Sequence, residues 1–308
     1  MVEMDYTQLI THRLLNTESE EIIKIATWAL CNLSRGQEID IDKQKCAVSA
    51  FAKVIVDTTH NIPIDTIKEA LDGLKNLISY KDNAFLIESG VIDRLYQLCQ
   101  IDTDKILPGT VSVLSHVSYG GNEDCMVIIT SGFLDVFYKI LQKSDDLISV
   151  LLKQDVLWIL SNLTVCDDQE IIQKVIGELD HFKILMNYCF HGKIKVRKEA
   201  IWTLCNVTLN GSNDQMNSLV QHGIFKMFQE NLRFESDPDI IKTVLEATEN
   251  ILTAGAEQGD KFEEVYLDLM ENNFLFDRLE QLLKHENTDI YKNALRVIEN
   301  FCDTEDDI

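Results

Sequence analysis

Proline and glycine are scarce in this chain, at 3 and 13 of its 308 residues. A protein of many short strands and tight turns needs more of both, because these residues supply the backbone conformations of turns. Leucine, isoleucine, glutamate and lysine are instead abundant, a usage that favours helices. Hydrophobic residues make up 45% of the chain, enough to bury a core. The composition therefore predicts a folded, helical protein.

Basic residues are also in short supply. The chain has 28 lysines and arginines against 51 aspartates and glutamates, which gives a net charge of -23. Such a charge repels nucleic acid and anionic membranes, and it attracts basic partners. Solubility alone would explain the excess of acid equally well, so the charge by itself does not distinguish a binding surface from a solvated one.

The cysteines lack the CxxC spacing that is typical of zinc and redox sites. Most of them lie in apolar helical runs, so we expect reduced, buried thiols and neither a structural disulfide nor a metal site. The eight positions are Cys31, Cys46, Cys99, Cys125, Cys166, Cys189, Cys205 and Cys302.

Signals for secretion, membrane insertion and catalysis are missing as well. The start of the chain lacks the basic region and long apolar core of a signal peptide, and no run of about 18 apolar residues occurs. There is no Gly-rich phosphate loop, no HExxH and no Ser or Cys in a nucleophile setting, and the seven histidines are scattered. We therefore expect a soluble protein that is not an enzyme, needs no cofactor and binds neither nucleic acid nor membrane.

One apolar phrase recurs through the chain. Its copies are ATWALCNLS at 26–34, ALDGLKNLI at 70–78, TVSVLSHVS at 110–118, VLWILSNLT at 156–164, AIWTLCNVT at 200–208, VLEATENIL at 244–252 and ALRVIENFC at 294–302. The marker residues Asn32, Asn76, His116, Asn162, Asn206, Asn250 and Asn300 are spaced 44, 40, 46, 44, 44 and 50 residues apart. A period of roughly 40 to 47 residues is typical of HEAT and armadillo solenoids, in which each repeat buries its apolar face against its neighbours.

The pattern within a repeat predicts three helices, the number found in armadillo repeats, rather than the two of HEAT repeats. The segment NAFLIESG ends at Gly90 as a helix stop, VIDRLYQLCQ forms a second helix, and the third helix runs from about Asp104 to Tyr119. The same glycine stop follows at Gly132 and Gly223. We therefore predict an all-α fold, an armadillo solenoid with a right-handed superhelical course.

The predicted solenoid occupies residues 1–302 and has about seven repeats, the first of them partial. An acidic tail follows at 303–308. No linker divides the chain, although the segment AGAEQGD at 254–260 predicts a longer loop.

The third helix of a repeat presents a polar face beside its apolar one. In EIIKIATWALCNLSRG, the residues predicted to form the buried stripe are Ile22, Ala26, Ala29, Leu30 and Leu33. Trp28 and Asn32 fall off this stripe and lie one turn apart on a single face. The same pair recurs as Trp158 with Asn162 and as Trp202 with Asn206.

A Trp in a helical repeat is usually a core residue, but a core Trp has no need of an Asn four residues later. Repetition in one register instead favours a site for an extended basic peptide on the concave surface. The Asn amides can hydrogen-bond the peptide main chain, and the indoles can stack on Lys or Arg stems for about 0.5 to 2 kcal/mol per contact. Carboxylates three residues before two of the Trp residues, Asp155 and Glu199, can receive the charged head groups.

These segments resemble a known family. WALCNLSRG, WILSNLT and WTLCNVT are similar to the Trp-xxx-Asn helices of importin-alpha, the adaptor that carries basic nuclear localisation signals into the nucleus. HENTDIYKNALRVIENFCDTEDD at 285–307 resembles the last importin-alpha repeat and its acidic tail, and ENILTAGAEQ resembles the repeat before it. The resemblance spans essentially the whole chain and implies a protein-transport adaptor that shuttles between cytoplasm and nucleus.

The resemblance aligns the seven phrases with the fourth to tenth armadillo repeats of the family. The first repeats and the basic importin-beta-binding segment are then expected to be absent, so importin-beta is an expected partner only if an amino-terminal segment supplies that sequence. Of the family's major signal-binding site, only the last part remains, as Trp28, Asn32 and Arg35. The minor site is largely kept, and we expect cargo to bind mainly there.

Some positions depart from the family pattern. Asp72, with Asn76 after it, stands where the fifth repeat of the family carries a Trp. In the next repeat, Ser112 and His116 replace an Arg and an Asn. Asp72 is expected to favour an extra basic residue in the linker of a longer signal. Glu246 and Asn250 can meet a further cation or form a solvated face. The full predicted peptide site comprises Trp28, Asn32, Arg35, Asp72, Asn76, His116, Asp155, Trp158, Asn162, Glu199, Trp202, Asn206, Glu246 and Asn250.

Cargo proteins with basic localisation signals are the partners that the resemblance implies, with the family's export factor at the last two repeats, including Glu286 and the tail from Asp303. Two alternatives stay open. One is a truncated importin-alpha paralogue that binds proteins without supporting import. The other is a different armadillo scaffold of the catenin kind, although that would need basic third helices where this chain has acidic ones.

Overall fold

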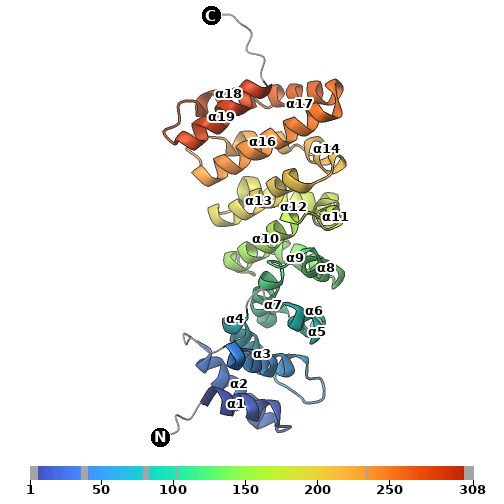
Figure 1. Cartoon of the computed structure of the whole chain (residues 1–308), viewed down its shortest axis with the longest axis vertical. Coiled ribbons are helices and arrows are strands. Elements are labelled where there is room, and N and C mark those ends of the chain that lie inside the picture. Colours follow the sequence, from blue (N-terminus) through green and yellow to red (C-terminus); the bar gives the residue numbers. More distant parts are fainter. Residues whose placement is uncertain (1–5, 36–40, 79–82, 102, 234, 302–308) are drawn as a thin grey trace, which may run out of the picture. The chain divides into compact units, whose positions relative to one another are not determined.

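The computed structural model describes residues 6–35, 41–78, 83–101, 103–233 and 235–301, and all regular structure in these ranges is helical (Figure 1). The predicted all-α class is therefore confirmed. These residues fall into two compact units, Met1–Ile148 and Ser149–Ile308. Cys302 and the predicted acidic tail at 303–308 lie outside the described residues.

The first unit stacks three helices in a row, with α2 against α4 and α4 against α7, while α3 and α6 pack behind them. Its helices are α1 (Tyr6–Leu15), α2 (Glu20–Leu33), α3 (Ile41–Val56), α4 (Ile64–Leu77), α5 (Asn83–Glu88), α6 (Val91–Ile101), α7 (Thr103–Val117), α8 (Asn122–Thr130) and α9 (Phe133–Gln142).

The second unit repeats this arrangement, and its third helices have 16, 17, 21 and 14 residues. α10 packs on α13, α13 on α16 and α16 on α19, and a second row is formed by α12, α15 and α18 (Figure 1). The helices are α10 (Val150–Val165), α11 (Gln169–Ile176), α12 (Leu179–His191), α13 (Ile194–Asn210), α14 (Asn213–Gln221), α15 (Ile224–Asn231), α16 (Pro238–Gln258), α17 (Asp260–Asn272), α18 (Leu275–Leu282) and α19 (Thr288–Phe301).

Three helices per repeat are found in four places, α5–α7, α11–α13, α14–α16 and α17–α19. In the repeat that ends in α4, the described residues hold one helix, α3, before the third helix, and residues 36–40 of this repeat lie outside the described ranges. The segment KQKCAVSAFAKVIV in α3 contains no glycine, so nothing stops the helix midway.

Glycines end the first helix of several repeats, as the sequence predicts. Gly90, Gly132 and Gly223 have φ angles of 77°, 84° and 89°, a left-handed conformation that glycine adopts without the steric cost of a Cβ. In the last repeat, Phe274 takes this role with φ 57°, which strains the backbone of a bulky residue.

The longer loop predicted at 254–260 is wrong. Helix α16 continues to Gln258, and only Gly259 separates it from α17. Ala254 and Gly255 are buried, and a Cβ added at Gly255 would meet the Tyr266 ring at 2.6 Å. The small residues of this segment therefore let α17 pack closely on α16, and this contact extends the helix.

The core consists of aliphatic and aromatic side chains between the rows of helices, with Phe51, Phe133, Phe137, Phe225 and Phe228 fully enclosed. The buried stripe of α2 differs from the predicted one. Ala26 and Leu30 are buried as expected, but Ile22, Ala29 and Leu33 are partly exposed, and Ile23, Thr27 and Cys31 complete the stripe.

Cys46 is exposed, which corrects the expectation of buried thiols, whereas the other described cysteines are buried. It lies on α3, near the amino end of that helix. None of the helices within the described ranges is both long enough and apolar enough to cross a bilayer.

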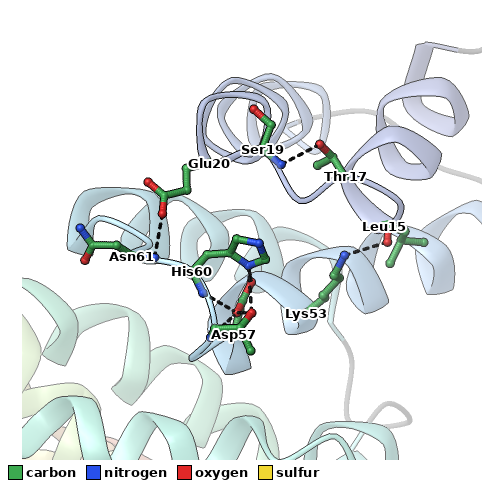
Figure 2. Close-up of polar contacts among 9 residues, drawn as sticks. Leu15, Thr17, Ser19, Glu20, Lys53, Asp57, His60 and Asn61 are labelled. Carbon is green, nitrogen blue, oxygen red and sulfur yellow. Dashed lines mark hydrogen bonds and ion pairs between the residues drawn. The ribbon is translucent and has the colours of Figure 1, made fainter.

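Polar contacts tie the end of α1 and the start of α2 to α3 and to the loop that follows it (Figure 2). Lys53 Nζ donates to the Leu15 carbonyl at 2.8 Å, and the Asn61 N–H donates to Glu20 Oε1 at 3.0 Å. These contacts fix α1 and α2 against α3, which helps to set the position of the third-helix row in the first unit.

Asp57 organises the loop after α3. Its carboxylate accepts hydrogen bonds from the Thr59 N–H at 2.8 Å and from His60 Nδ1 at 2.6 Å (Figure 2). Burial alone would raise the pKa of Asp57, but the hydrogen bonds from Thr59 and His60 outweigh it and hold the pKa at about 2.

Candidate functional site

In the second unit, the predicted Trp–Asn pairs lie on two adjacent third helices. Trp158 and Asn162 are on α10, Trp202 and Asn206 are on α13, and the two helices pack side by side. All four side chains are partly exposed rather than core residues. They therefore occupy equivalent positions on one row of helices, which gives neighbouring repeats the same combination of indole and amide.

The Asn side chains also join consecutive third helices, a role that the sequence analysis missed. Asn206 Nδ2 donates to the Ser161 carbonyl on α10 at 3.0 Å, and Asn250 Nδ2 donates to Thr208 Oγ1 on α13 at 3.2 Å. A primary amide has two N–H donors and a carbonyl acceptor. One such bond to the preceding repeat therefore leaves each amide able to bond a peptide as well.

Trp202 is held in a fixed orientation. Its Nε1–H donates to Thr243 Oγ1 on α16 at 3.0 Å. Lys198 Nζ lies 5.9 Å from the centre of the Trp202 ring, and the same ammonium pairs with Asp237 at 3.0 Å and Asp239 at 3.2 Å. The chain itself thus shows a lysine placed over this indole with its charge received by carboxylates.

Sequence reasoning did not single out Lys198 or Thr243. The position of Lys198 four residues before Trp202 was a usable signal, because residues at this spacing are neighbours on one helix face. Thr243 carried no comparable signal, since it belongs to the next repeat.

Asp155 and Glu199 have equivalent places in the sequence pattern, but the structure distinguishes them. Asp155 on α10 is exposed, whereas Glu199 on α13 is only 6% exposed. Burial is the main cause that raises the pKa of Glu199 to about 7, and the negative charge of Asp155 adds to it, although a hydrogen bond with the Gln154 side chain lowers it. The Oε2 atom of Glu199 has no hydrogen-bond partner among the described residues.

On α16, Glu246 is exposed and Asn250 is partly exposed. The neighbouring Glu249 accepts two hydrogen bonds from Arg296 on α19, at 2.9 Å from Nε and 2.6 Å from Nη2. Glu249 is therefore already engaged by an arginine, while Glu246 points its carboxylate to the surface.

In the first unit, Trp28, Asn32 and Arg35 lie on α2, and Trp28 is 57% exposed. These residues and Asp72 of α4 line one cavity of about 380 Å³, together with Cys31, Asp65, Lys68 and Glu69. Asn76 Nδ2 donates to Ser34 Oγ across the same two helices at 3.1 Å. The structure thus brings Trp28, Asn32, Arg35 and Asp72 to one cavity.

The cavity has more acid than the sequence analysis assigned to it. Asp65, Glu69 and Asp72 are four and three residues apart, which places them on one face of α4. Burial raises the pKa of Glu69, Lys24 opposes the rise, and the charges of Asp65 and Asp72 add to it. The spacing was visible in the sequence and could have identified Asp65 and Glu69.

His116 lies on α7, the next third helix of this unit, and its side chain is partly exposed. Its carbonyl accepts a hydrogen bond from Asn83 Nδ2 at 3.4 Å. No group of His, Cys, Asp and Glu side chains in the described part of the chain is arranged to hold a metal ion.

Solved structures with this fold are armadillo-repeat proteins. The designed armadillo repeat protein YIII(Dq)4CqI superposes with a TM-score of 0.67 at 20% identity, covering 82% of this chain and 98% of its own. The designed armadillo repeat protein YIII(Dq.V1)4CPAF in complex with peptide (KR)4 superposes with a TM-score of 0.69 at 22% identity, covering 82% and 99%. A family model described as atypical Arm repeat matches residues 264–308. The chain therefore has the armadillo-repeat fold.

The similar curated proteins are importin subunits. Importin subunit alpha-8 of Arabidopsis thaliana is 28% identical over 280 residues, covering 90% of this chain and 62% of the relative. Importin subunit alpha-5 of the same plant is 26% identical over 300 residues, covering 97% and 56%. Importin subunit alpha-1b of Oryza sativa subsp. japonica is 28% identical over 349 residues, covering 96% and 62%. The chain is similar to these importin alpha subunits over nearly all of its own length and spans 56% to 62% of theirs.

Proposed function

We propose that this chain is a nuclear-import adaptor module that binds extended basic peptides of the nuclear-localisation kind. The main site comprises Trp158, Asn162, Trp202 and Asn206. The observation that carries the proposal is the repetition of one partly exposed Trp–Asn pair on the packed helices α10 and α13, each with a carboxylate one turn earlier.

The chemistry of these side chains suits such a peptide. Lysine or arginine stems stack on the indoles for about 0.5 to 2 kcal/mol each, the amides bond the peptide main chain, and Asp155 and Glu199 receive the charged heads. Since each contact is modest, affinity comes from several in succession. The peptide runs antiparallel to the order of the repeats, and Glu246 with Asn250 on α16 offers a further contact.

The cavity of the first unit serves as a second contact region. Its indole wall at Trp28 and its carboxylates at Glu69 and Asp72 suit one lysine or arginine side chain. Asn32, Arg35, Asn76 and His116 belong to the same proposed region. This cavity provides for an extra basic residue in the linker of a longer signal.

The wider role is proposed from the relatives. As part of an import adaptor, the repeats form one solenoid over residues 1–302, and the protein shuttles between cytoplasm and nucleus. An export factor binds at the last two repeats, including Glu286. Importin-beta binds only where an amino-terminal segment supplies its recognition sequence.

The test is calorimetric titration of the chain with a monopartite and a bipartite basic peptide. We expect both to bind and the Trp158→Ala/Trp202→Ala variant to bind neither. A control is Phe262→Ala, which removes an exposed aromatic side chain from α17, outside the third helices. Helicity measured by circular dichroism must be the same in all three proteins.

Equal binding by the double variant would contradict the assignment of the site. Absence of binding by the unmodified chain would contradict the proposed cargo function and favour a paralogue that serves other protein partners. Added salt is expected to weaken the complex steeply, because the contacts join acidic and basic groups. A complex insensitive to salt would instead indicate an apolar partner.

A further inference from the structure

Glu199 is the one carboxylate of the proposed site that the described structure buries almost completely. Its side chain lies on α13 against α10, 6% exposed, and Oε2 has no hydrogen-bond partner among the described residues. A buried carboxylate is expensive unless it is paired, because ionisation in a poorly solvated place costs several kcal/mol. Glu199 is therefore either neutral or in need of a cation.

The ion pairs of the nearby cations are made with other residues. Lys198, beside Glu199 on α13, pairs with Asp237 and Asp239 at the start of α16, and its charge lowers the pKa of Glu199 by less than burial raises it. From α10, Lys153 lies 5.8 Å from the centre of the Tyr188 ring of α12.

One neighbouring acid also opposes the ionisation of Glu199. The negative charge of Asp155 on α10 raises the pKa of the Glu199 carboxyl. The surroundings of Glu199 thus combine burial with negative charge, and a cation entering from outside would be favoured on both counts.

We infer that Glu199 couples binding of a basic peptide to release of a proton: as a lysine or arginine head group comes to lie beside the Glu199 carboxyl, that carboxyl loses its proton to solvent. This inference rests on the proposed function. The balance is simple, because one O–H bond breaks, the proton leaves to buffer, and the carboxylate is neutralised by the peptide cation. No other reactant is needed.

The expected size follows from linkage. The Glu199 pKa is raised to about 7 by burial, with Asp155 adding to the rise, so the free protein holds this proton at pH 6 and has lost it at pH 8. The peptide lysines and arginines stay charged throughout this range. If the Glu199 carboxylate is ionised in the complex at both pH 6 and pH 8, the affinity for the peptide rises about tenfold between these two pH values. Near pH 7, about half a proton is released per bound peptide.

The test is calorimetric titration of the full chain with a basic peptide that contains no histidine, at pH 6, 7 and 8. Repeating the pH 7 titration in two buffers of different ionisation enthalpy counts the protons released. The Glu199→Gln variant is the decisive comparison, because it isolates the contribution of this one carboxyl. Glutamine keeps the shape of the side chain and cannot ionise.

We expect Glu199→Gln to bind with less than about a twofold change from pH 6 to pH 8 and with no proton release from this position. The matched control, Glu246→Gln, removes an exposed carboxylate of the same row. It is expected to weaken binding through lost charge while keeping the pH dependence. Circular dichroism checks that both variants are folded.

The outcomes separate the inference from the function on which it rests. A peptide that binds the unmodified chain without pH dependence or proton release would overturn the coupling and leave the peptide site standing. The same pH dependence in Glu199→Gln would also overturn it. No binding at any pH would remove the proposed function and the inference together.

Discussion

Replacing Glu199 by glutamine is expected to stabilise the protein above neutral pH and to leave its stability nearly unchanged in acid. Burial, with Asp155 beside it, raises the pKa of Glu199 from 4.5 to about 7. Between these values the unfolded chain has released a proton that the folded protein still holds. The folded state therefore loses stability as the pH rises from 4.5 to about 7, and the loss is constant at higher pH.

The magnitude follows from the displacement of the pKa. Each pKa unit corresponds to about 1.4 kcal/mol, so a rise from 4.5 to about 7 amounts to roughly 3 kcal/mol at pH 8. We expect the glutamine variant to recover about 2 kcal/mol, because local relaxation and water relieve part of the burial cost. For a unit of this size, that corresponds to a rise in melting temperature of about 4 to 8 °C.

The assay is thermal unfolding followed by circular dichroism, with Glu199→Gln and the unmodified protein compared at pH 8 and at about pH 4.5. The other carboxylates are present in both proteins, so their contributions to the pH dependence of stability cancel in this comparison. Glu246→Gln, with an exposed side chain, is the control and is expected to melt within about 1 °C of the unmodified protein at both pH values. Identical melting of Glu199→Gln and the unmodified protein at pH 8 would refute the reasoning, since it would mean that the ionised Glu199 is well compensated.

Three further predictions concern other parts of the molecule. Phe274→Gly is expected to stabilise the last repeat by about 1 kcal/mol in denaturant titration, because glycine relieves the strain at φ 57°; a destabilised variant would show that the exposed ring contributes more than the strain costs. Asp57→Ala should lower stability by about 1 kcal/mol. Hydrogen bonds hold the Asp57 pKa at about 2, below its ordinary 3.8. The difference in stability between this variant and the unmodified protein should therefore persist above pH 3.8 and vanish as the pH falls towards 2. A stability difference already lost near pH 5 would contradict the assigned contacts. Asp72→Asn should weaken a bipartite peptide with a basic linker residue by about two- to fivefold in calorimetry and leave unchanged the same peptide with alanine there; equal weakening of both peptides would show that Asp72 does not contact the linker.

The features that the sequence predicted well are those that recur from one armadillo repeat to another. The Trp-xxx-Asn phrase identified α10 and α13, and the glycine stops at Gly90, Gly132 and Gly223 were confirmed by their φ angles. Local chemistry decides these features, because a period near 44 residues and a left-handed glycine are properties of the chain itself.

The features that the sequence could not give depend on contacts between repeats. The loop expected at 254–260 is helix because Gly255 lies against Tyr266. Glu199 and Asp155 occupy equivalent positions three residues before a Trp, yet only Glu199 is buried. Its helix, α13, packs on α10, and this contact between repeats cannot be read from the sequence. Lys198 lies over Trp202 through its ion pairs with Asp237 and Asp239 of the next repeat. Each of these depends on tertiary contacts, and only Lys198 carried a local signal, its position four residues before Trp202.

The central claim is that basic peptides contact Trp158 and Trp202, and intrinsic tryptophan fluorescence tests it most directly. The chain has three tryptophans, so a Trp28→Phe variant leaves only these two as reporters. Titration with a peptide that lacks Trp is expected to shift their emission and saturate at the concentration where calorimetry saturates, with both signals weakened by salt. Calorimetric binding without any change in tryptophan emission would place the peptide elsewhere and contradict the account.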